Sequence, residues 1–197
     1  MRVRSILKAA ALATAALGVG AAALRTQDGA ELDAALFTAG NADAGPTADR
    51  FFLGVTELGS LYTAGAAAAT LTVLGRRTEA SRALTAAGVT WLLGQGVKKL
   101  VARPRPYEAD VEGTRFLIAP PHGTSWPSSH PAVFTAFATV AGRELDLGLF
   151  SRGGLTGIGT AVAASRVYVG VHYPSDVVSG FLMGRAVAAL WPSRDPR

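Results

Sequence analysis

Six apolar runs, separated by polar segments, follow one another along the 197 residues of the chain. Runs of this kind are typical of helices that are buried in a protein core or in a lipid bilayer. They predict an all-α fold, a six-helix transmembrane bundle, with helices at Met1–Leu24, Phe51–Leu74, Ala83–Val97, Pro131–Gly142, Gly153–Ala164 and Val177–Trp191.

Several of these runs contain only about 12 to 15 residues, a length more typical of a core helix than of a bilayer span. A soluble helical bundle is therefore an alternative. With the N-terminus inside, the inner segments hold ten basic and four acidic residues, and the outer segments hold eight and nine. This asymmetry follows the positive-inside tendency and favours the membrane bundle. Glu57 and Arg185 remain within spans, where we expect Glu57 to face the bundle interior and Arg185 to snorkel toward water.

The first apolar run has two interpretations, a retained transmembrane helix or a signal peptide cleaved near Ala21–Ala23. Both place the polar segment that follows on the outer side. We expect that segment to be a loop with at most one short surface helix. The predicted regions are an N-terminal transmembrane helix (or signal peptide) at 1–25, an extracytoplasmic loop at 26–50, a core at 51–191 and a cytoplasmic tail at 192–197.

Composition narrows the possible partners. The chain has no cysteine, which excludes a disulfide framework and a thiolate metal site. The formal net charge is +5, but the basic residues are spread along the chain without a dense tract. Nucleic acid is therefore not an expected partner, whereas the lipid bilayer is.

The polar stretch before the last apolar run carries side chains suited to catalysis. Arg166 offers a planar fork of donors that suits a phosphate or a carboxylate. Pro174 favours the first turn of a helix, so we expect His172 on the entry loop and Asp176 one turn into the helix. An aspartate that reaches back to one imidazole nitrogen leaves the lone pair of the other nitrogen free to attack.

Two further polar segments lie on the same side of the membrane in the predicted topology. One contains Lys98 and Arg105, and the other runs from Ser128 to His130. Snorkelling lysines and capping serines would explain either segment alone. The convergence of all three segments on one side predicts a site for an anion.

Together these segments resemble the type 2 phosphatidic acid phosphatase (PAP2) family, which shares its site with vanadium haloperoxidases. The first family motif, a lysine, six residues and then Arg-Pro, is matched by residues 98–106. The second, Pro-Ser-Gly-His, appears at 127–130 with Ser129 in place of the glycine. The third, Ser-Arg, five residues, His, three residues, Asp, is matched in full by residues 165–176. The resemblance runs from about residue 51 to residue 191.

The resemblance implies a metal-independent phosphatase that works through a phosphohistidine. It implies His172 as the nucleophile, His130 as the general acid and base, and Asp176 as the group that orients His172. The phosphate-binding residues that it implies are Lys98, Arg105, Ser128, Ser129 and Arg166. We expect no cofactor, and the two histidines lack a carboxylate cluster at the spacing of metal ligands.

Three residues near the motifs need separate interpretation. Ser129 keeps the backbone donor of the family glycine and adds a hydroxyl, but it would be strained if the position required a positive φ. His122 lies outside every motif and is interpreted as a solvated side chain. Arg103 is interpreted as a charge at the rim of the site.

The implied substrate is a lipid phosphate or pyrophosphate, hydrolysed at the extracytoplasmic surface of the cell membrane. Phosphatidic acid, a related glycerolipid phosphate and a polyprenyl (pyro)phosphate carrier are all candidates, and the sequence does not choose among them. Three alternatives stay open: a vanadate-dependent haloperoxidase, a non-catalytic membrane scaffold and a soluble acid phosphatase.

Overall fold

The computed structural model describes residues 3–109 and 113–192. Those residues form helices, turns and loops without a β-strand, so the predicted all-α class is confirmed. The helices are α1 (Val3–Arg25), α2 (Gln27–Gly40), α3 (Pro46–Glu57), α4 (Leu61–Val73), α5 (Arg77–Val101), α6 (Pro106–Ala109), α7 (Ser129–Glu144), α8 (Leu149–Tyr168) and α9 (Pro174–Leu190). The predicted C-terminal tail lies outside the described residues except for Pro192.

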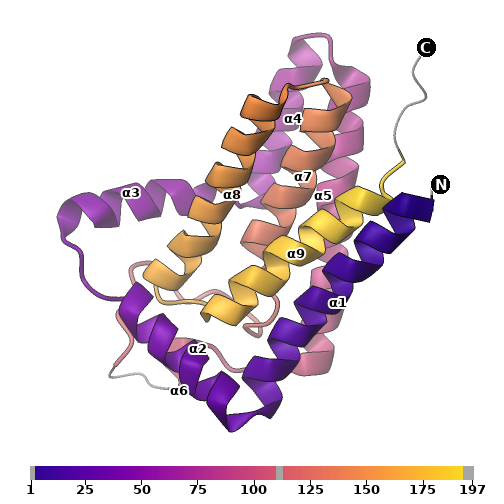
Figure 1. Ribbon diagram of the computed structural model, residues 1–197. Helices are drawn as coiled ribbons and strands as arrows, with labels where there is room; N and C mark the ends of the chain where they lie inside the picture. The colour runs from indigo at the N-terminus through magenta and orange to yellow at the C-terminus, as the bar shows by residue number, and fades with distance from the viewer. Residues whose placement is uncertain (1–2, 110–112, 193–197) are drawn as a thin grey trace.

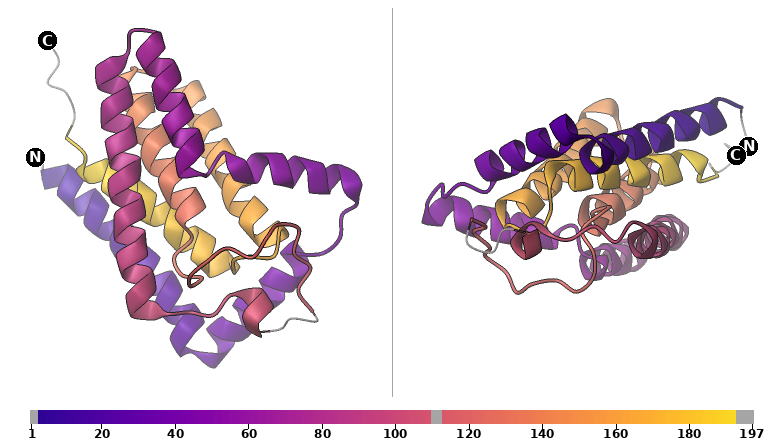
Figure 2. Two further views of the ribbon diagram at one scale, coloured as in Figure 1. Left: turned by 180° about the vertical axis from the view of Figure 1, so that it is seen from behind. Right: turned by 90° about the horizontal axis from the view of Figure 1, so that it is seen from below.

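Helix α7 lies at the centre of the bundle, where it packs against α4, α5, α8 and α9 (Figure 1). Helix α1 runs beside α9 in all three views (Figures 1 and 2). Small side chains line the contacts of α7, and one buried cluster joins Ala83 and Ala86 of α5 to Val140 and Ala141 of α7 and to Ala188 of α9. Side chains of this size let the helix axes approach closely.

The six-helix prediction is only partly correct, because the chain makes more helices than it has long apolar runs. Residues 51–74, expected as one helix, form the end of α3 and all of α4. Ser60 starts α4 by accepting a hydrogen bond from the amide of Thr63 at 3.1 Å. As a result α3 points away from the bundle (Figure 2), and Glu57 at its end is exposed rather than directed to the interior.

The prediction of a loop at residues 26–50 is also wrong, since α2 and the first part of α3 occupy most of that segment. Thr26 caps α2 by accepting from the amide of Gly29 at 3.1 Å, and Pro46 opens α3. The glycines that suggested a loop include Gly40, the last residue of α2, and Gly45, which precedes α3 with a φ of 89°.

Among the described helices, α1 alone combines the length and the apolar composition needed to cross a membrane, and α4 is apolar but shorter. A signal sequence near an N-terminus has the same properties as α1. Both interpretations of the first apolar run therefore remain predictions at this stage.

One end of the bundle collects the polar segments singled out by the sequence. Helices α5 and α8 end there, and α7 and α9 begin there, close to α2 (Figure 1). Because the three motifs lie at these four helix ends, the topology brings them together.

Candidate active site

His172 lies in the turn between α8 and α9, and its side chain is almost fully buried. Its Nε2 atom lies 3.4 Å from Nη1 of Arg105, and its Nδ1 atom lies 3.4 Å from Oδ2 of Asp176. Burial, followed by the charges of Arg105, Lys98 and Arg166, lowers the pKa of His172 well below its ordinary value. The imidazole is therefore neutral near pH 7 and keeps a lone pair on one nitrogen.

The turn that carries His172 is fixed by Gly170 and Asn41. Gly170 has a φ of 84°, and a Cβ at this position would collide with the carbonyl oxygen of Arg115. The side chain of Asn41, at the end of α2, donates to the carbonyl oxygens of Arg115 at 2.6 Å and Tyr168 at 2.9 Å. The position of the imidazole therefore depends on α2 as well as on α8 and α9.

Asp176 is completely buried in the first turn of α9. Its Oδ2 atom accepts from the backbone amide of Tyr173 at 2.9 Å and from the hydroxyl of Ser125, besides facing His172. Its Oδ1 atom accepts from Nη1 of Arg103 at 2.7 Å. Asp176 reaches back to His172 as predicted, but its carboxylate also accepts hydrogen bonds from Ser125 and Arg103, which the sequence did not indicate as its partners.

Lys98, Arg105 and Arg166 are buried around His172, and none of them forms a salt bridge within the described part of the chain. Lys98 and Arg105 donate to main-chain carbonyls of residues 122–125, while Nη1 of Arg166 donates to the hydroxyl of Thr56 at 2.7 Å. The Nε atom of Arg166 is buried without a hydrogen-bond partner among the described residues. Buried charges that only neutral groups contact are costly, and an anion of two or more charges would relieve that cost.

His130 joins the same cluster from the second position of α7. It packs against Gly59, where a Cβ would lie only 2.7 Å from the Cβ of His130. The cationic side chains whose charges act on its imidazole are Arg166, Arg105 and Lys98. Both predicted catalytic histidines therefore face one set of cations.

The two serines before His130 make different contacts. The amide of Ser128 donates to the carbonyl oxygen of Asp176 at 3.0 Å, so this amide is not free to bind an anion. The hydroxyl of Ser128 is buried without a partner in the described structure and keeps its donor free. Ser129 is the first residue of α7 and is not among the described non-glycine residues with a positive φ, so serine fits there without strain.

An ionic network that the sequence did not predict lies beneath Asp176. Arg103 is 8% exposed rather than a rim charge, and its guanidinium lies 2.7 Å from Asp176 and 2.8 Å from Asp33. It also lies 4.0 Å over the ring of Tyr173. Asp33 accepts in addition from the amide and hydroxyl of Ser175, at 2.8 and 2.5 Å. Arg103 could have been found from its place inside the first motif, whereas no pattern marks Asp33.

The structure thus brings every residue predicted for the site to one end of the bundle. His122 lies outside the cluster and is exposed, which confirms its interpretation as a solvated side chain. Within residues 3–109 and 113–192, no group of three histidines and carboxylates is placed to hold a metal ion. The arrangement can bind a phosphate group and present one neutral imidazole to it.

The chain is similar to known proteins along most of its length. A model of the PAP2 superfamily matches residues 79–196. A structure of a transmembrane PAP2-type phosphatidylglycerolphosphate phosphatase from Bacillus subtilis superposes with a TM-score of 0.72 at 25% identity, covering 93% of both chains. The structure of LpxE from Aquifex aeolicus gives a TM-score of 0.70 at 28% identity, covering 81% of this chain and 93% of that one.

Curated relatives match a shorter part of the chain. Decaprenylphosphoryl-5-phosphoribose phosphatase from Mycobacterium tuberculosis is 36% identical over 94 residues, which are 48% of this chain and 49% of the relative. Undecaprenyl-diphosphatase from Sulfolobus acidocaldarius is 32% identical over 99 residues, 50% of this chain and 47% of the relative. The chain therefore spans about half the length of the curated relatives it matches.

Proposed function

This chain belongs to the PAP2 superfamily, and from that premise we propose that it releases phosphate from a lipid phosphate or pyrophosphate. The observation that carries the proposal is a buried, neutral His172 among three buried cations, none of which forms a salt bridge with a carboxylate of the described residues. A binding site for a neutral ligand would gain nothing from such a concentration of positive charge. A phosphate ester supplies both the missing negative charge and an electrophile for the imidazole.

In the bound state, the guanidinium groups of Arg105 and Arg166 and the ammonium of Lys98 surround the phosphate oxygens. The free hydroxyl of Ser128 and the start of α7 at Ser129 supply neutral donors. The cations then stabilise the charge that develops on the equatorial oxygens during phosphoryl transfer. In this scheme the side chains supply the electrostatic stabilisation, so phosphate release is expected to continue when chelator removes divalent metal.

In the first step, the Nε2 lone pair of His172 forms a bond to phosphorus as the bond from phosphorus to the lipid oxygen breaks. His130 gives a proton to the departing oxygen. Asp176 accepts from Nδ1–H of His172, which holds the tautomer with its lone pair on Nε2 and stabilises the cation that forms.

In the second step, water attacks the phosphohistidine while His130 takes a proton from it. The bond between Nε2 and phosphorus breaks, its electron pair returns to His172, and inorganic phosphate leaves. Each histidine ends in the state in which it began, so the cycle balances without a co-reactant other than water.

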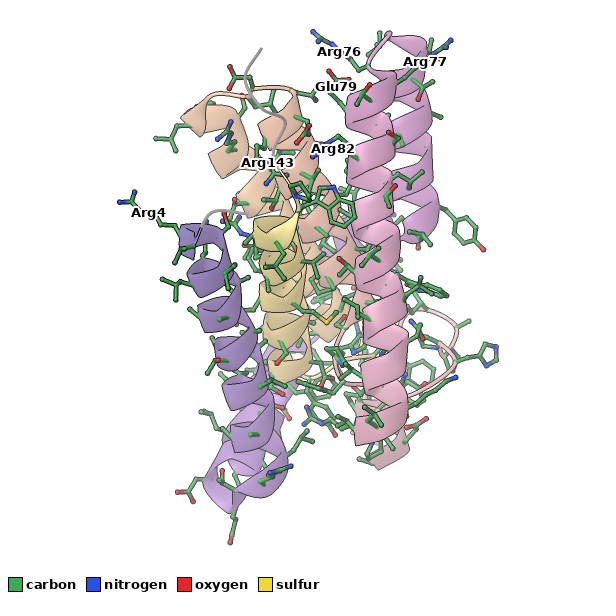
Figure 3. All side chains as sticks on the ribbon, turned by 90° about the vertical axis from the view of Figure 1, so that its right-hand side faces the viewer. Arg4, Arg76, Arg77, Glu79, Arg82 and Arg143 are labelled. Carbon is green, nitrogen blue, oxygen red and sulfur yellow. The ribbon has the colours of Figure 1, made fainter. Side chains whose placement is uncertain are left out.

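We place the bundle across the cell membrane as a multi-pass protein, with the site at the extracytoplasmic end. Helix α1 has the composition of a membrane helix, and one structural neighbour is described as transmembrane. Arg76, Arg77, Arg82 and Arg143 gather at the opposite end of the bundle (Figure 3), as expected for the cytoplasmic side.

We also propose that α1 is retained, so that residues 1–25 are a transmembrane helix rather than a cleaved signal peptide. The hydroxyl of Ser179 in α9 donates to the carbonyl oxygen of Ala16 at 2.9 Å, and Gly20 packs against the ring of Trp126. Removal of α1 would expose α9 and the loop that leads to the phosphate site. Residues 51–191 would form the phosphatase core and residues 192–197 a cytoplasmic tail.

Polyprenyl carriers are the substrates we favour among the candidate lipids. One curated relative is named a decaprenylphosphoryl-5-phosphoribose phosphatase and another an undecaprenyl-diphosphatase, so both names include a polyprenyl group, although each relative matches over only half its length. Phosphatidic acid and related glycerolipid phosphates are the second choice, in line with the name of the neighbour from Bacillus subtilis.

Phosphate release from a panel of these lipids tests the proposal. Wild type is compared with His172→Ala, His130→Ala and, as a matched control, His122→Ala at the exposed histidine outside the cluster. We expect release to fall by at least about 10³-fold in the first variant and to stay unchanged in the control. Equal rates for wild type and His172→Ala would remove the nucleophile and with it the mechanism.

A further inference from the structure

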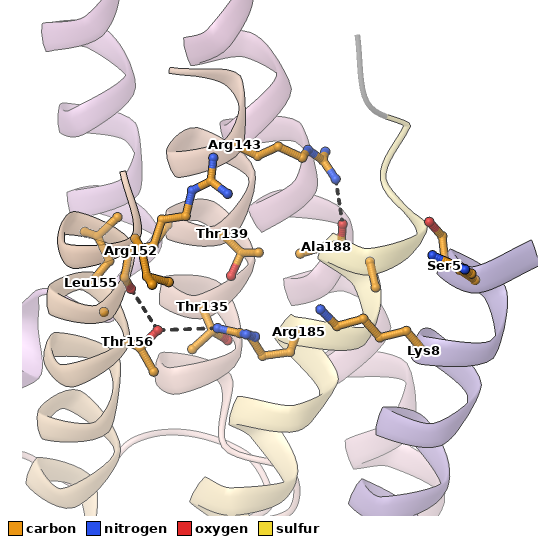
Figure 4. A pocket seen from close by; sticks show the side chains of 15 residues that line it. Ser5, Lys8, Thr135, Thr139, Arg143, Arg152, Leu155, Thr156, Arg185 and Ala188 are labelled. Carbon is orange, nitrogen blue, oxygen red and sulfur yellow. Dashed lines mark hydrogen bonds between the residues drawn. The ribbon is translucent and has the colours of Figure 1, made fainter. Parts of the chain in front are cut away.

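A groove of about 540 Å³ opens between α1, α7, α8 and α9, at the end of the bundle opposite the phosphate site (Figure 4). Among the residues that the structure describes, its lining includes no carboxylate but has basic residues from all four helices: Arg4, Lys8, Arg143, Arg152 and Arg185. Lys8 extends from α1 toward α9, and Arg185 extends from α9 toward α8 (Figure 4). This end of the molecule takes no part in the proposed hydrolysis.

The described residues provide few partners that neutralise the positive charges of the groove. Lys8 has no hydrogen bond or salt bridge among the described residues, and Arg185 contacts only the hydroxyl of Thr156 at 3.5 Å. Arg152 lies 3.7 Å from Asp146, whose fully exposed carboxylate is screened by water. Arg143 reaches Glu144 at 3.5 Å and donates to main-chain carbonyls, but its Nε is buried without a partner in the described structure.

The remaining lining is apolar and adjoins exposed apolar surface. Leu149 and Leu155 form one wall of the groove. Leu149 and its neighbour Phe150 are 89% and 96% exposed, and Leu7 on α1 is 64% exposed. A ligand that matches this lining carries a negative headgroup and long apolar chains.

We propose that the groove binds an anionic phospholipid of the cytoplasmic leaflet, with its phosphodiester among Lys8, Arg143 and Arg185 and an acyl chain along Leu149 and Leu155. The proposal rests on the membrane placement proposed above, which puts this end of the bundle at the inner surface. Basic pockets between membrane helices on that side are suited to anionic headgroups. A phosphodiester is not a substrate for the proposed hydrolysis, so binding and turnover can be measured separately.

Equilibrium binding of labelled phosphatidylglycerol to the purified protein in mixed micelles tests the proposal, with phosphatidylcholine as the neutral comparison. We expect wild type to prefer phosphatidylglycerol at least about tenfold. Because each cation near an anionic lipid contributes roughly a fivefold factor, the double variant Lys8→Gln/Arg185→Gln should bind about 25-fold more weakly. The control Arg76→Gln/Arg77→Gln removes two charges at the same end but outside the groove, and should change binding less than about twofold.

Several outcomes would overturn the proposal. An equal loss in the control pair would mean general attraction to anionic micelles, and displacement by soluble glycerol phosphate at equal concentration would mean a site for a free anion. If the double variant does not fold, Lys8→Gln alone is decisive, because this exposed lysine should still account for about a fivefold loss. His172→Ala should bind phosphatidylglycerol as wild type does. The lipid-binding measurement can therefore be interpreted even if the proposed phosphatase activity is not found.

Discussion

Asp33 offers the sharpest test of how the site is built, because it contacts no reacting group and acts only through Arg103 and Ser175. Asp33→Asn keeps the shape of the side chain but removes its charge and one acceptor oxygen. One of the three donors that now meet Asp33 would then face an amide NH₂. Asp176 would then be the one carboxylate left to pair with Arg103 among the described residues, so its interaction with Arg103 should strengthen and its interaction with His172 should weaken.

The magnitude follows from these contacts. A hydrogen bond to a charged group is worth about 1.5 to 3 kcal/mol when buried, so the variant should lose about 2 to 3 kcal/mol of stability. For a chain of this length that corresponds to a fall in Tm of roughly 4 to 12 °C. Misplacement of His172 and Asp176 should lower kcat by about 10- to 100-fold, while KM changes little because the three cations proposed to bind phosphate stay in place.

The assay is the pH profile of phosphate release, with Asp28→Asn as the matched control, since Asp28 lies exposed on the same helix. Loss of one negative charge near His172 disfavours its protonated form and lowers its pKa further, so the acid limb of kcat/KM should move to lower pH. A purely structural role would reduce the amount of active enzyme without moving that limb. Unchanged kcat in Asp33→Asn, or an equal effect in Asp28→Asn, would refute the reasoning.

Three further predictions concern the phosphate site and its orientation. Because burial and the nearby cations lower the pKa of His172 well below its ordinary value, the acid decline of kcat/KM should begin at lower pH than the range in which an unperturbed histidine titrates. A decline centred in that ordinary range or above it would contradict this. Ser129→Gly should change kcat less than about threefold, since Ser129 has no positive φ; a larger loss would mean that the hydroxyl contacts the substrate. In a chain without native cysteine, His122→Cys should react with a membrane-impermeant maleimide on intact cells and Arg77→Cys only after lysis, and the reverse pattern would invert the proposed topology.

The sequence allowed the cluster of cations and histidines to be predicted because each motif lies beside a helix end. Prolines such as Pro174 mark those ends locally, and helix topology then brings them together. The partners of Asp176 were harder to foresee. The pairing of Arg103 with Asp33 is a tertiary contact between residues 70 positions apart. In addition, the glycines near Asp33 led to the prediction of a loop where the structure has helix α2. The division between α3 and α4 was missed for a similar reason, since an apolar run does not show where a helix changes direction.

The contact between Asp33 and Ser175 joins positions 142 residues apart in the chain. During synthesis the carboxylate is therefore made long before the helix that will bury it, and it must stay hydrated until α9 emerges. Completion of α9 then supplies Asp176 beside the proposed nucleophile, closes the ionic network with Arg103 and Asp33, and packs against α1. Catalytic competence thus arrives late and all at once, so a chain that stops short of α9 is expected to have no partial activity.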